Sequence, residues 1–179
     1  MEEIISELKE KFGAEPDSRA IDKCVIVAAE KLLSAILHLK ENHAFDVLID
    51  IAGVDYLGME NHNAPRFAVI YCLKSTKSMA RLRLKVQADE NEKIPTLSNV
   101  YPIADWQERE VWDQFGIVFE NHHNLKRLLN HIDFEGHPLR KDYPVKKRQW
   151  LSENDIMLDQ LEERLETLGY KVVDIGGIA

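Results

Sequence analysis

ARLRLKVQA, residues Ala80–Ala88, is the clearest strand in the sequence. Apolar side chains alternate there with basic or amide side chains, which is the period of a strand with one buried and one solvated face. An apolar run at residues 66–73 precedes it, and polar residues at 75–78 join the two segments, so the pair predicts an antiparallel hairpin. The buried face of such a hairpin has to be covered, and helices are the natural cover.

Working outward from the hairpin, apolar residues recur at helical spacing near the start of the chain and again after a short strand. The elements expected are a helix near residues 4–12 that ends at Gly13, a strand at 24–28, a core-facing helix at 29–42 and a strand at 45–54. We therefore predict an α+β fold, a small mixed or antiparallel sheet with helices packed on it, followed by an extended C-terminal arm. The expected parts are a core domain at residues 1–120, a partner-binding arm at 121–151, and a C-terminal helix and tail at 152–179.

The second half of the chain begins with a charged, aromatic helix expected at residues 106–115. Asp105 and Glu108 have the spacing of a capping box at its start, and Gly116 is a suitable residue for its end. Arg109 and Asp113 are four residues apart, so an ion pair along the helix surface is expected. Beyond this helix, the pattern predicts one or two helical turns at 124–129, a helix with a leucine stripe at 152–168 and a terminal strand at 170–175.

Composition limits the possible partners. The 179 residues are 45 % hydrophobic and 30 % charged, with a formal net charge of −8, so nucleic acid is not an expected partner. Residues 121–148 differ from the rest, with seven Lys/Arg against three acids. Such a basic segment is usually a solvated loop, but it can also be a docking surface for an acidic partner. The chain opens without the basic region of a leader peptide and contains no run of about 20 apolar residues. We therefore expect membrane contact only through a complex.

Several kinds of catalytic or metal site lack their residues. Phosphate-binding glycine loops, nucleophile elbows and CxxC pairs are absent, and Cys24 and Cys72 lie in apolar contexts typical of buried thiols in a reducing compartment. Four histidines lie close in sequence (His122, His123, His131 and His137), but they lack regular ligand spacing, and adjacent histidines point apart in most backbones. We expect no catalytic, cofactor-binding or metal residues. A stand-alone enzyme with a carboxylate or histidine site around Glu110, Asp113 and His137 is the alternative.

Two ordered blocks of sequence carry a family resemblance. The first is EREVWDQFGI at Glu108–Ile117, followed by His122 and by KRLL at Lys126–Leu129. The second is FEGHPLRKDYP at Phe134–Pro144. Together they resemble the 30-kDa subunit family (the C-type subunit) of proton-translocating NADH:quinone oxidoreductase, respiratory complex I.

The resemblance implies a cofactor-free structural subunit of the peripheral arm, on the cytoplasmic side of the cell membrane. NADH, flavin, iron–sulfur clusters and quinone would bind to partner subunits, so this subunit of the translocase would have no catalytic residues of its own. The implied partners are a D-like quinone-site subunit and a B-like iron–sulfur subunit. The residues expected at the interface are Glu108, Arg109, Glu110, Asp113, His122, Arg127, His137, Arg140, Lys141, Asp142 and Tyr143.

Two departures from the family pattern are visible. His123 stands where the family usually has proline, so the turn after His122 is expected to differ locally. Residues 152–179 are not a hallmark of the family and suggest a lineage-specific helix that packs on a neighbouring subunit. Because relatives also occur in membrane-bound nickel–iron hydrogenases and related dehydrogenase complexes, an equivalent subunit of such a complex is a further alternative.

Overall fold

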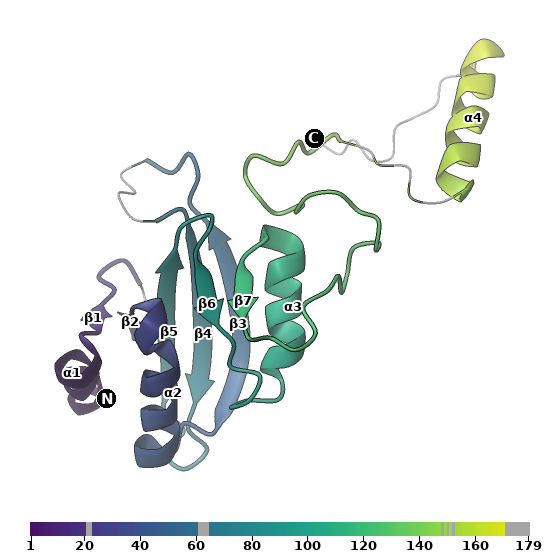
Figure 1. Ribbon diagram of the computed structural model, residues 1–179. Coiled ribbons are helices and arrows are strands. Elements are labelled where there is room, and N and C mark those ends of the chain that lie inside the picture. The colour runs from purple at the N-terminus through teal and green to yellow at the C-terminus, as the bar shows by residue number, and fades with distance from the viewer. Residues whose placement is uncertain (21–22, 61–64, 148, 150, 152, 171–179) are drawn as a thin grey trace.

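A five-stranded mixed sheet in the order β1-β2-β5-β4-β3 is the centre of the molecule (Figure 1). The computed structural model describes residues 1–20, 23–60, 65–147, 149, 151 and 153–170. The strands of this sheet are β1 (Glu15–Pro16), β2 (Cys24–Ile26), β3 (Val47–Asp55), β4 (Phe67–Lys74) and β5 (Arg81–Ala88). A second, two-stranded parallel sheet pairs β6 (Lys93–Pro95) with β7 (Val118–Glu120). The helices are α1 (Glu2–Phe12), α2 (Ala29–His43), α3 (Ala104–Phe115) and α4 (Glu153–Thr167).

The predicted hairpin is formed by β4 and β5, which pair antiparallel with Tyr71 opposite Leu84. β3 adds to it antiparallel and β2 adds parallel, so the sheet is mixed and the predicted α+β class is confirmed. The alternation along β5 holds with one exception. Lys85 was expected in solvent but is buried, because its Nζ lies 2.9 Å from the Asp17 carboxylate and over the ring of Tyr56.

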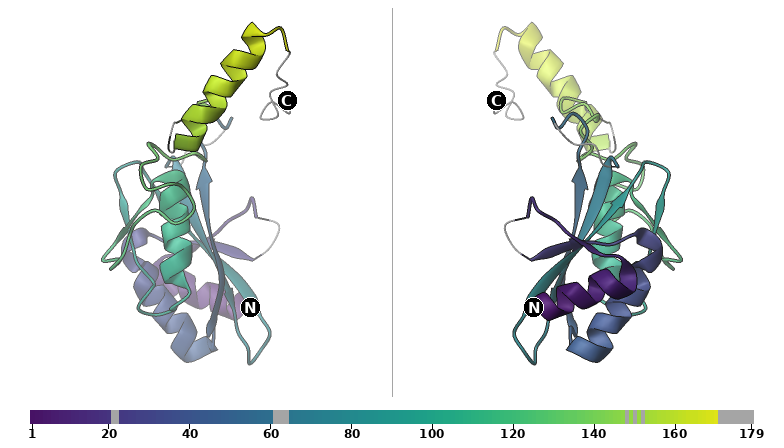
Figure 2. Two further views of the ribbon diagram at one scale, coloured as in Figure 1. Left: turned by 90° about the vertical axis from the view of Figure 1, so that its right-hand side faces the viewer. Right: turned by 90° about the vertical axis from the view of Figure 1, so that its left-hand side faces the viewer.

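α2 and α3 lie on the same face of the sheet (Figures 1 and 2). Leu32, Ile36 and Leu39 of α2 are fully buried in the core, together with apolar side chains of β4 and β5. α3 packs over β3 at Gly53, where an added Cβ would lie 2.6 Å from the Phe115 ring. The glycine therefore allows the close approach of helix and sheet on which the position of α3 depends.

The helix ends follow backbone chemistry more than the expected side-chain caps. Gly13 and Gly116 end α1 and α3 in the left-handed conformation, with φ of 65° and 79°, as expected. The capping box at Asp105 and Glu108 was a wrong prediction, since α3 begins at Ala104 and Ile103 precedes it without a side-chain cap. Asp105 instead lies in the first helical turn, where its negative charge interacts favourably with the helix dipole.

The segment after β7 contains no helix or strand among its described residues 121–147. The predicted helical turns at 124–129 were therefore wrong. The hydrogen bonds explain why no helical turn forms. The backbone N–H groups of residues 128–130 donate to the side chain of Asp113 on α3, and not to carbonyl oxygens of a preceding turn. The strand expected at 170–175 falls almost entirely outside the described residues.

α4 stands away from the sheet, beyond this irregular segment (Figures 1 and 2). Leu158, Leu161 and Leu168 on its expected stripe are 56 %, 52 % and 64 % exposed. In the part of the chain that the structure describes, no helix combines the length and apolar character needed to cross a bilayer.

Candidate functional site

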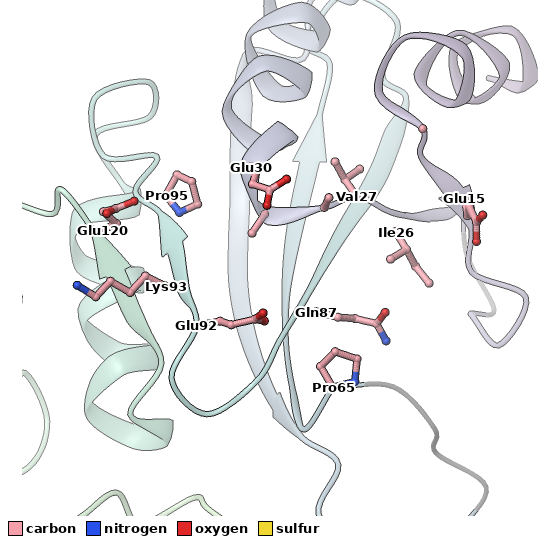
Figure 3. A pocket seen from close by; sticks show the side chains of 13 residues that line it. Glu15, Ile26, Val27, Glu30, Pro65, Gln87, Glu92, Lys93, Pro95 and Glu120 are labelled. Atoms are coloured by element: carbon pink, nitrogen blue, oxygen red, sulfur yellow. The ribbon is translucent and has the colours of Figure 1, made fainter.

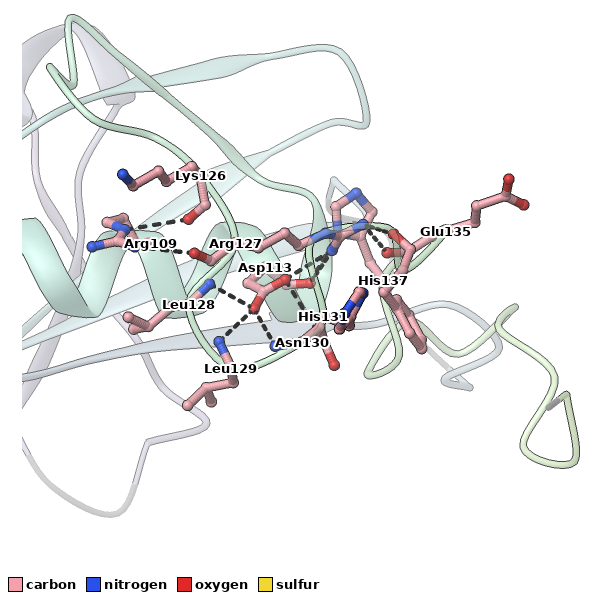
Figure 4. A network of polar contacts seen from close by, with 12 residues as sticks. Arg109, Asp113, Lys126, Arg127, Leu128, Leu129, Asn130, His131, Glu135 and His137 are labelled. Atoms are coloured by element: carbon pink, nitrogen blue, oxygen red, sulfur yellow. Dashed lines mark hydrogen bonds and ion pairs between the residues drawn. The ribbon is translucent and has the colours of Figure 1, made fainter. Parts of the chain in front are cut away.

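Among the described residues of the second half of the chain, the carboxylate of Asp113 on α3 accepts the most hydrogen bonds (Figure 4). One oxygen accepts from the backbone N–H groups of Leu128, Leu129 and Asn130 at 3.1, 2.8 and 2.9 Å. The other accepts from Arg127 at 2.8 Å and from the Asn130 side chain at 3.1 Å. The carboxylate is fully buried, and burial alone would raise its pKa, but these donors hold the pKa well below its usual range. Asp113 is therefore a fixed anion that organises the following loop.

Arg127 completes the arrangement from the loop side. Its guanidinium donates to the carbonyl oxygens of Phe134 and Gly136 at 2.6 and 2.8 Å as well as to Asp113, and it lies 5.4 Å from the centre of the Trp112 ring. The Arg127 guanidinium thus connects α3 with residues 134–136, at the far end of the loop that begins near Arg127 itself. We call residues 124–139, held onto the C-terminal half of α3 in this way, the α3 clasp.

Arg109 takes a different partner from the one expected. Its Nε and Nη2 donate to the carbonyl oxygens of Lys126 and Arg127 at 3.2 and 3.0 Å, and its guanidinium lies over the Trp106 ring. The predicted ion pair between Arg109 and Asp113 was therefore wrong, because Arg127 occupies the carboxylate. The clasp offers backbone carbonyl acceptors that spacing along the helix does not reveal.

His137 packs against the end of α3. Its Nδ1 lies 3.0 Å from the Asp113 carbonyl oxygen, and its ring meets the edge of Trp112. A Cβ on Gly116 would lie 2.6 Å from this imidazole, so the two sequence blocks at Glu108–Ile117 and Phe134–Pro144 meet in space. Burial lowers the pKa of His137. This histidine is consequently a packing and hydrogen-bonding group of the clasp.

Glu108 is fully buried at the other end of the helix. One of its carboxylate oxygens accepts from the Leu97 N–H at 2.7 Å, and the other accepts from the Thr96 hydroxyl at 2.5 Å. Burial raises the pKa of this carboxyl to about 7, against the lowering effect of those two hydrogen bonds. Glu108 therefore fixes the segment after β6 onto α3, which is the role that replaces the predicted capping box.

A second ion-pair network, which was not predicted from the sequence, ties the chain beyond the clasp to the sheet. Arg66 contacts the buried Asp55 through two nitrogens at 3.0 and 2.8 Å and reaches Asp142 at 2.9 Å. Arg140 bonds to Asp142 and to Glu90. The hydrogen bonds from Arg66 and Arg140 hold the pKa of the Asp142 carboxyl well below its usual range. Asp55 and Arg66 escaped the prediction because their partners lie far away in sequence.

The remaining predicted interface residues are more exposed. Lys141 is exposed, although its backbone N–H donates to Asp55 at 2.9 Å, and Glu110 is exposed on α3. Tyr143 is half-buried, stacks on Phe134 and accepts from Gln149 at 2.8 Å. The structure thus places most of the predicted residues together around α3 and the following segment, and their contact with a partner stays a prediction.

His122 and His123 were expected to point apart, and that was wrong. Their rings stack with an interplanar angle of 2° and a centroid distance of 5.3 Å, and both approach Asp105. Nε2 of His122 lies 3.1 Å from the Asp105 carbonyl oxygen, while its Nδ1 accepts from the Asn124 N–H at 3.1 Å. The buried His122 therefore serves α3 and the start of the clasp with both nitrogens.

The hollows near these residues are small. One of about 240 Å³ is lined by Glu110, Val111 and Leu139 among others, and a further one of about 360 Å³ includes His137 and Tyr143. A larger hollow of about 610 Å³ lies elsewhere, between β1, the start of α2 and β6 (Figure 3). The residues that line it include the acids Glu15, Glu30, Glu92 and Glu120 and the base Lys93, which lie apart from one another. Of the three residues in the stand-alone enzyme alternative, Glu110 lines the first of the two hollows near α3 and His137 lines the second, while Asp113 lines neither.

The fold and the α3 clasp together define the class: a small α+β protein in which a long irregular segment is fixed onto one helix of a helix-covered mixed sheet. Residues 25–149 match the family described as "Respiratory-chain NADH dehydrogenase, 30 Kd subunit". Since the match spans more than half of the sequence, the chain belongs to this family, and the predicted resemblance is confirmed.

Three similar proteins agree with this assignment. The C-type subunit of NADH-quinone oxidoreductase from Phenylobacterium zucineum is 44 % identical over 117 residues, covering 65 % of this chain and 54 % of the relative. The C/D-type subunit of the same enzyme from Bdellovibrio bacteriovorus is 44 % identical over 128 residues, covering 72 % of this chain and 22 % of that protein. The solved trypsin-resistant fragment (1-134) of Nqo5 has a TM-score of 0.63 at 32 % identity, covering 69 % of this chain and 98 % of the fragment.

The chain spans about half of the length of the Phenylobacterium relative. The two sequence relatives just described carry the names of NADH-quinone oxidoreductase subunits, and they do not favour the nickel–iron hydrogenase alternative.

Proposed function

We propose that this chain is a non-catalytic structural subunit of the peripheral arm of a proton-translocating NADH:quinone oxidoreductase, and that it docks on a D-like quinone-site subunit. The observation that carries the proposal is the α3 clasp, in which the two sequence blocks typical of the family fold against each other around Asp113 and Arg127. The Bdellovibrio relative, named as a C/D-type subunit, joins a region like this chain to a second subunit in one polypeptide. A fusion of that kind supports direct contact between the two.

The docking surface proposed is the outer side of the clasp and the segment that follows it. This segment is basic, and four of its large apolar side chains are exposed: Leu129, Ile132, Leu139 and Val145. Apolar anchors within a charged rim are the usual composition of a protein interface. Because Asp113, Arg127 and Arg140 already hold the segment in place, docking would lose little conformational entropy.

A structural role also agrees with the chemistry of the side chains. Asp113 is fully buried and used in internal hydrogen bonds, so Glu110 is the one accessible carboxylate of the stand-alone enzyme alternative. Burial raises the pKa of the Cys24 thiol to about 11, so it is a poor metal ligand or nucleophile. We propose that flavin, iron–sulfur clusters and quinone are bound by partner subunits, including a B-like iron–sulfur subunit near this chain. In this proposal the chain is peripheral, on the cytoplasmic side of the cell membrane.

The test is affinity purification of the tagged full chain from membranes solubilised in mild detergent, with mass spectrometry of the co-purified proteins. Recovery of D-like and B-like subunits together with NADH-binding subunits is the expected result. Recovery of a nickel–iron large subunit without NADH-binding subunits would transfer the same scaffold to a hydrogenase complex. A chain recovered without partners, with activity of its own, would contradict the structural role.

A further inference from the structure

A cluster unrelated to the clasp lies between α1 and α2. The carboxylate of Glu7 on α1 faces two imidazoles of α2, with His38 Nε2 at 3.0 Å from one oxygen and His43 Nε2 at 2.7 Å from the other. The three side chains are only 30 %, 14 % and 22 % exposed. Neither α1 nor these two histidines take part in the docking surface proposed above.

The three side chains supply a familiar set of metal ligands. Two histidines and one carboxylate, with a fourth position for water, are a common way to bind zinc, at ligand distances near 2.0–2.2 Å. Tetrahedral geometry at those distances places neighbouring ligand atoms roughly 3.3 Å apart. One ligand atom of each of Glu7, His38 and His43 lies within 4.8 Å of the other two, so small side-chain movements suffice to admit an ion.

We propose that Glu7, His38 and His43 bind a divalent cation of the zinc class, and that the ion ties α1 to α2. This inference goes beyond the proposed function, since it concerns a structural ion and not a redox cofactor. It also goes beyond the histidines singled out in the sequence. His38 and His43 have the H-x4-H spacing found between the histidines of zinc fingers, but no CxxC pair accompanies them, and Glu7 lies on another helix.

The second nitrogen of each imidazole decides whether the ring can bind a metal through Nε2, because Nδ1 must then carry the proton. No described residue forms a hydrogen bond with Nδ1 of His43, so this tautomer is available there. Nδ1 of His38 lies 2.9 Å from the side-chain amide of Asn42, which is exposed. Turning that amide presents its oxygen to the Nδ1 proton, at the loss of one solvent-exposed bond to the His38 carbonyl oxygen.

Glu7 is also suited to bind a cation. Its carboxylate is the anionic member of the ligand set, and its two oxygens already face the two imidazoles. The Lys11 ammonium lies 2.5 Å from Glu7 and competes with a cation, but its side chain is 50 % exposed and free to turn into solvent. The Phe12 ring, 5.5 Å from the His38 ring, forms an apolar wall on one side. Because the Lys11 ammonium competes for the Glu7 carboxylate, replacing Lys11 should increase the affinity of the site for the cation.

The Asp105, His122 and His123 cluster also brings three ligand types together, with His122 Nε2 3.1 Å and His123 Nε2 3.8 Å from Asp105. It is less suited to a metal, because Nδ1 of His122 accepts a backbone N–H from Asn124 and so requires the proton on Nε2. A metal on that nitrogen would displace the proton and break the backbone hydrogen bond. This cluster therefore provides a matched control.

The test uses the full chain, freed of metal with a chelator and titrated with Zn²⁺ by calorimetry and with Co²⁺ by visible absorption. We expect one Zn²⁺ per chain, tetrahedral cobalt absorption and a raised thermal unfolding temperature. Glu7→Gln and His43→Ala should each weaken binding by more than the roughly 10- to 100-fold that loss of a supporting residue costs. His123→Ala should bind as the unaltered chain does, and Lys11→Ala should bind more tightly.

Circular dichroism and urea unfolding without metal show whether each variant is folded. Lys11→Ala protects the test against a simple folding defect, because the proposal requires it to gain affinity. Absence of saturable Zn²⁺ binding to the unaltered chain would overturn the proposal. So would unchanged or weaker binding in Lys11→Ala, unchanged binding in Glu7→Gln, or loss of binding in His123→Ala.

Discussion

Arg127 lies 2.8 Å from the buried carboxylate of Asp113 and donates at the same time to the carbonyl oxygens of Phe134 and Gly136. This ion pair therefore fixes the loop at residues 127–136 against helix α3. The pair joins residues far apart in sequence, and each charge is satisfied by several additional hydrogen bonds. Such a pair is most sensitive to removal of one partner, which leaves the other charge buried and unpaired.

Asp113→Ala should therefore destabilise the protein strongly. Loss of the carboxylate leaves the Arg127 charge without its anionic partner and the N–H groups of residues 128–130 without their acceptor. We expect the free energy of unfolding to fall by about 3–5 kcal/mol. Urea unfolding measures this change, and limited proteolysis should show new cleavage within residues 124–139. Asp133→Ala is the control, because Asp133 belongs to the same segment and its side chain is 78 % exposed. Equal stability of the two variants would contradict the role given to Asp113.

Glu108 should make stability depend on pH near neutrality. Its pKa is raised by burial from 4.5 to about 7, so between these values the folded chain binds a proton that the unfolded chain releases. The stabilisation from this group is complete below pH 4.5 and is lost as pH rises through 7, by about 3 kcal/mol in all.

Glu108→Gln should remove that slope, since the amide stays uncharged and its oxygen still accepts from the Leu97 N–H. Urea unfolding at several pH values, with the difference between variant and parent taken at each, isolates the contribution. Glu110→Gln, an exposed position on the same helix, should keep the parent's pH profile. A Glu108→Gln profile parallel to that of the parent would refute the assignment.

The elements of the fold were largely predictable because their signals are local. The hairpin at β4 and β5, α2, α3 and the glycine ends of α1 and α3 follow from periodicity and from turn residues. The short strand β6 was missed, because three residues carry too little pattern to show. The predicted turns at 124–129 failed because Asp113 takes the backbone N–H groups that a helix would have used.

The residues of the site were predictable, but their partners were not. Arg109, Asp113 and His137 were all selected, and Arg127 was added through the family resemblance. Spacing along one helix suggested Arg109 for Asp113, whereas the fold supplies Arg127 from the following loop. Asp55 and Arg66 gave no signal at all, since the residues that complete their network lie beyond residue 89. Contacts of that range require the fold to be known.

Gly53→Ala should disturb the packing of α3 against β3. The backbone there needs no left-handed conformation, so the effect comes from crowding alone, with the new Cβ 2.6 Å from the Phe115 ring. We expect a loss of about 1–3 kcal/mol in the free energy of unfolding, measured in urea. Phe115→Leu should cost less in the Gly53→Ala background than in the parent, because the smaller side chain relieves the clash. Additive effects of the two substitutions would show that the ring and the glycine are not coupled.

Arg140→Ala should affect assembly more than stability. Arg140 bonds to Asp142 and Glu90, which are 45 % and 49 % exposed, so the chain itself should lose no more than about 1 kcal/mol. The segment carrying Lys141 and Tyr143 would be held less firmly, and we expect a lower yield of the purified complex with unchanged turnover per complex. Arg140→Lys keeps the positive charge but lacks the planar guanidinium. Its yield of purified complex should lie between that of the parent and that of Arg140→Ala. A normal yield with reduced turnover would contradict a purely structural role.

The leucine stripe of α4 should matter only when a partner is present. Leu158, Leu161 and Leu168 are more than half exposed in the isolated chain, so replacing them removes little buried apolar surface. The double variant Leu158→Ser/Leu161→Ser should therefore leave the urea unfolding midpoint of the chain nearly unchanged. If the stripe packs on a neighbouring subunit, as the sequence analysis suggests, the same variant should reduce the recovery of partners in the affinity purification.

The matched control for that experiment is Glu163→Ser, on the opposite face of the same helix. Combined with Glu166→Ser, it introduces the same residue twice, with a similar total change in helix propensity, but leaves the leucines in place. We expect this control to recover partners as the parent does. Equal losses in both variants would mean that helix formation alone matters, and full recovery in both would show that the stripe packs on no partner of the purified complex.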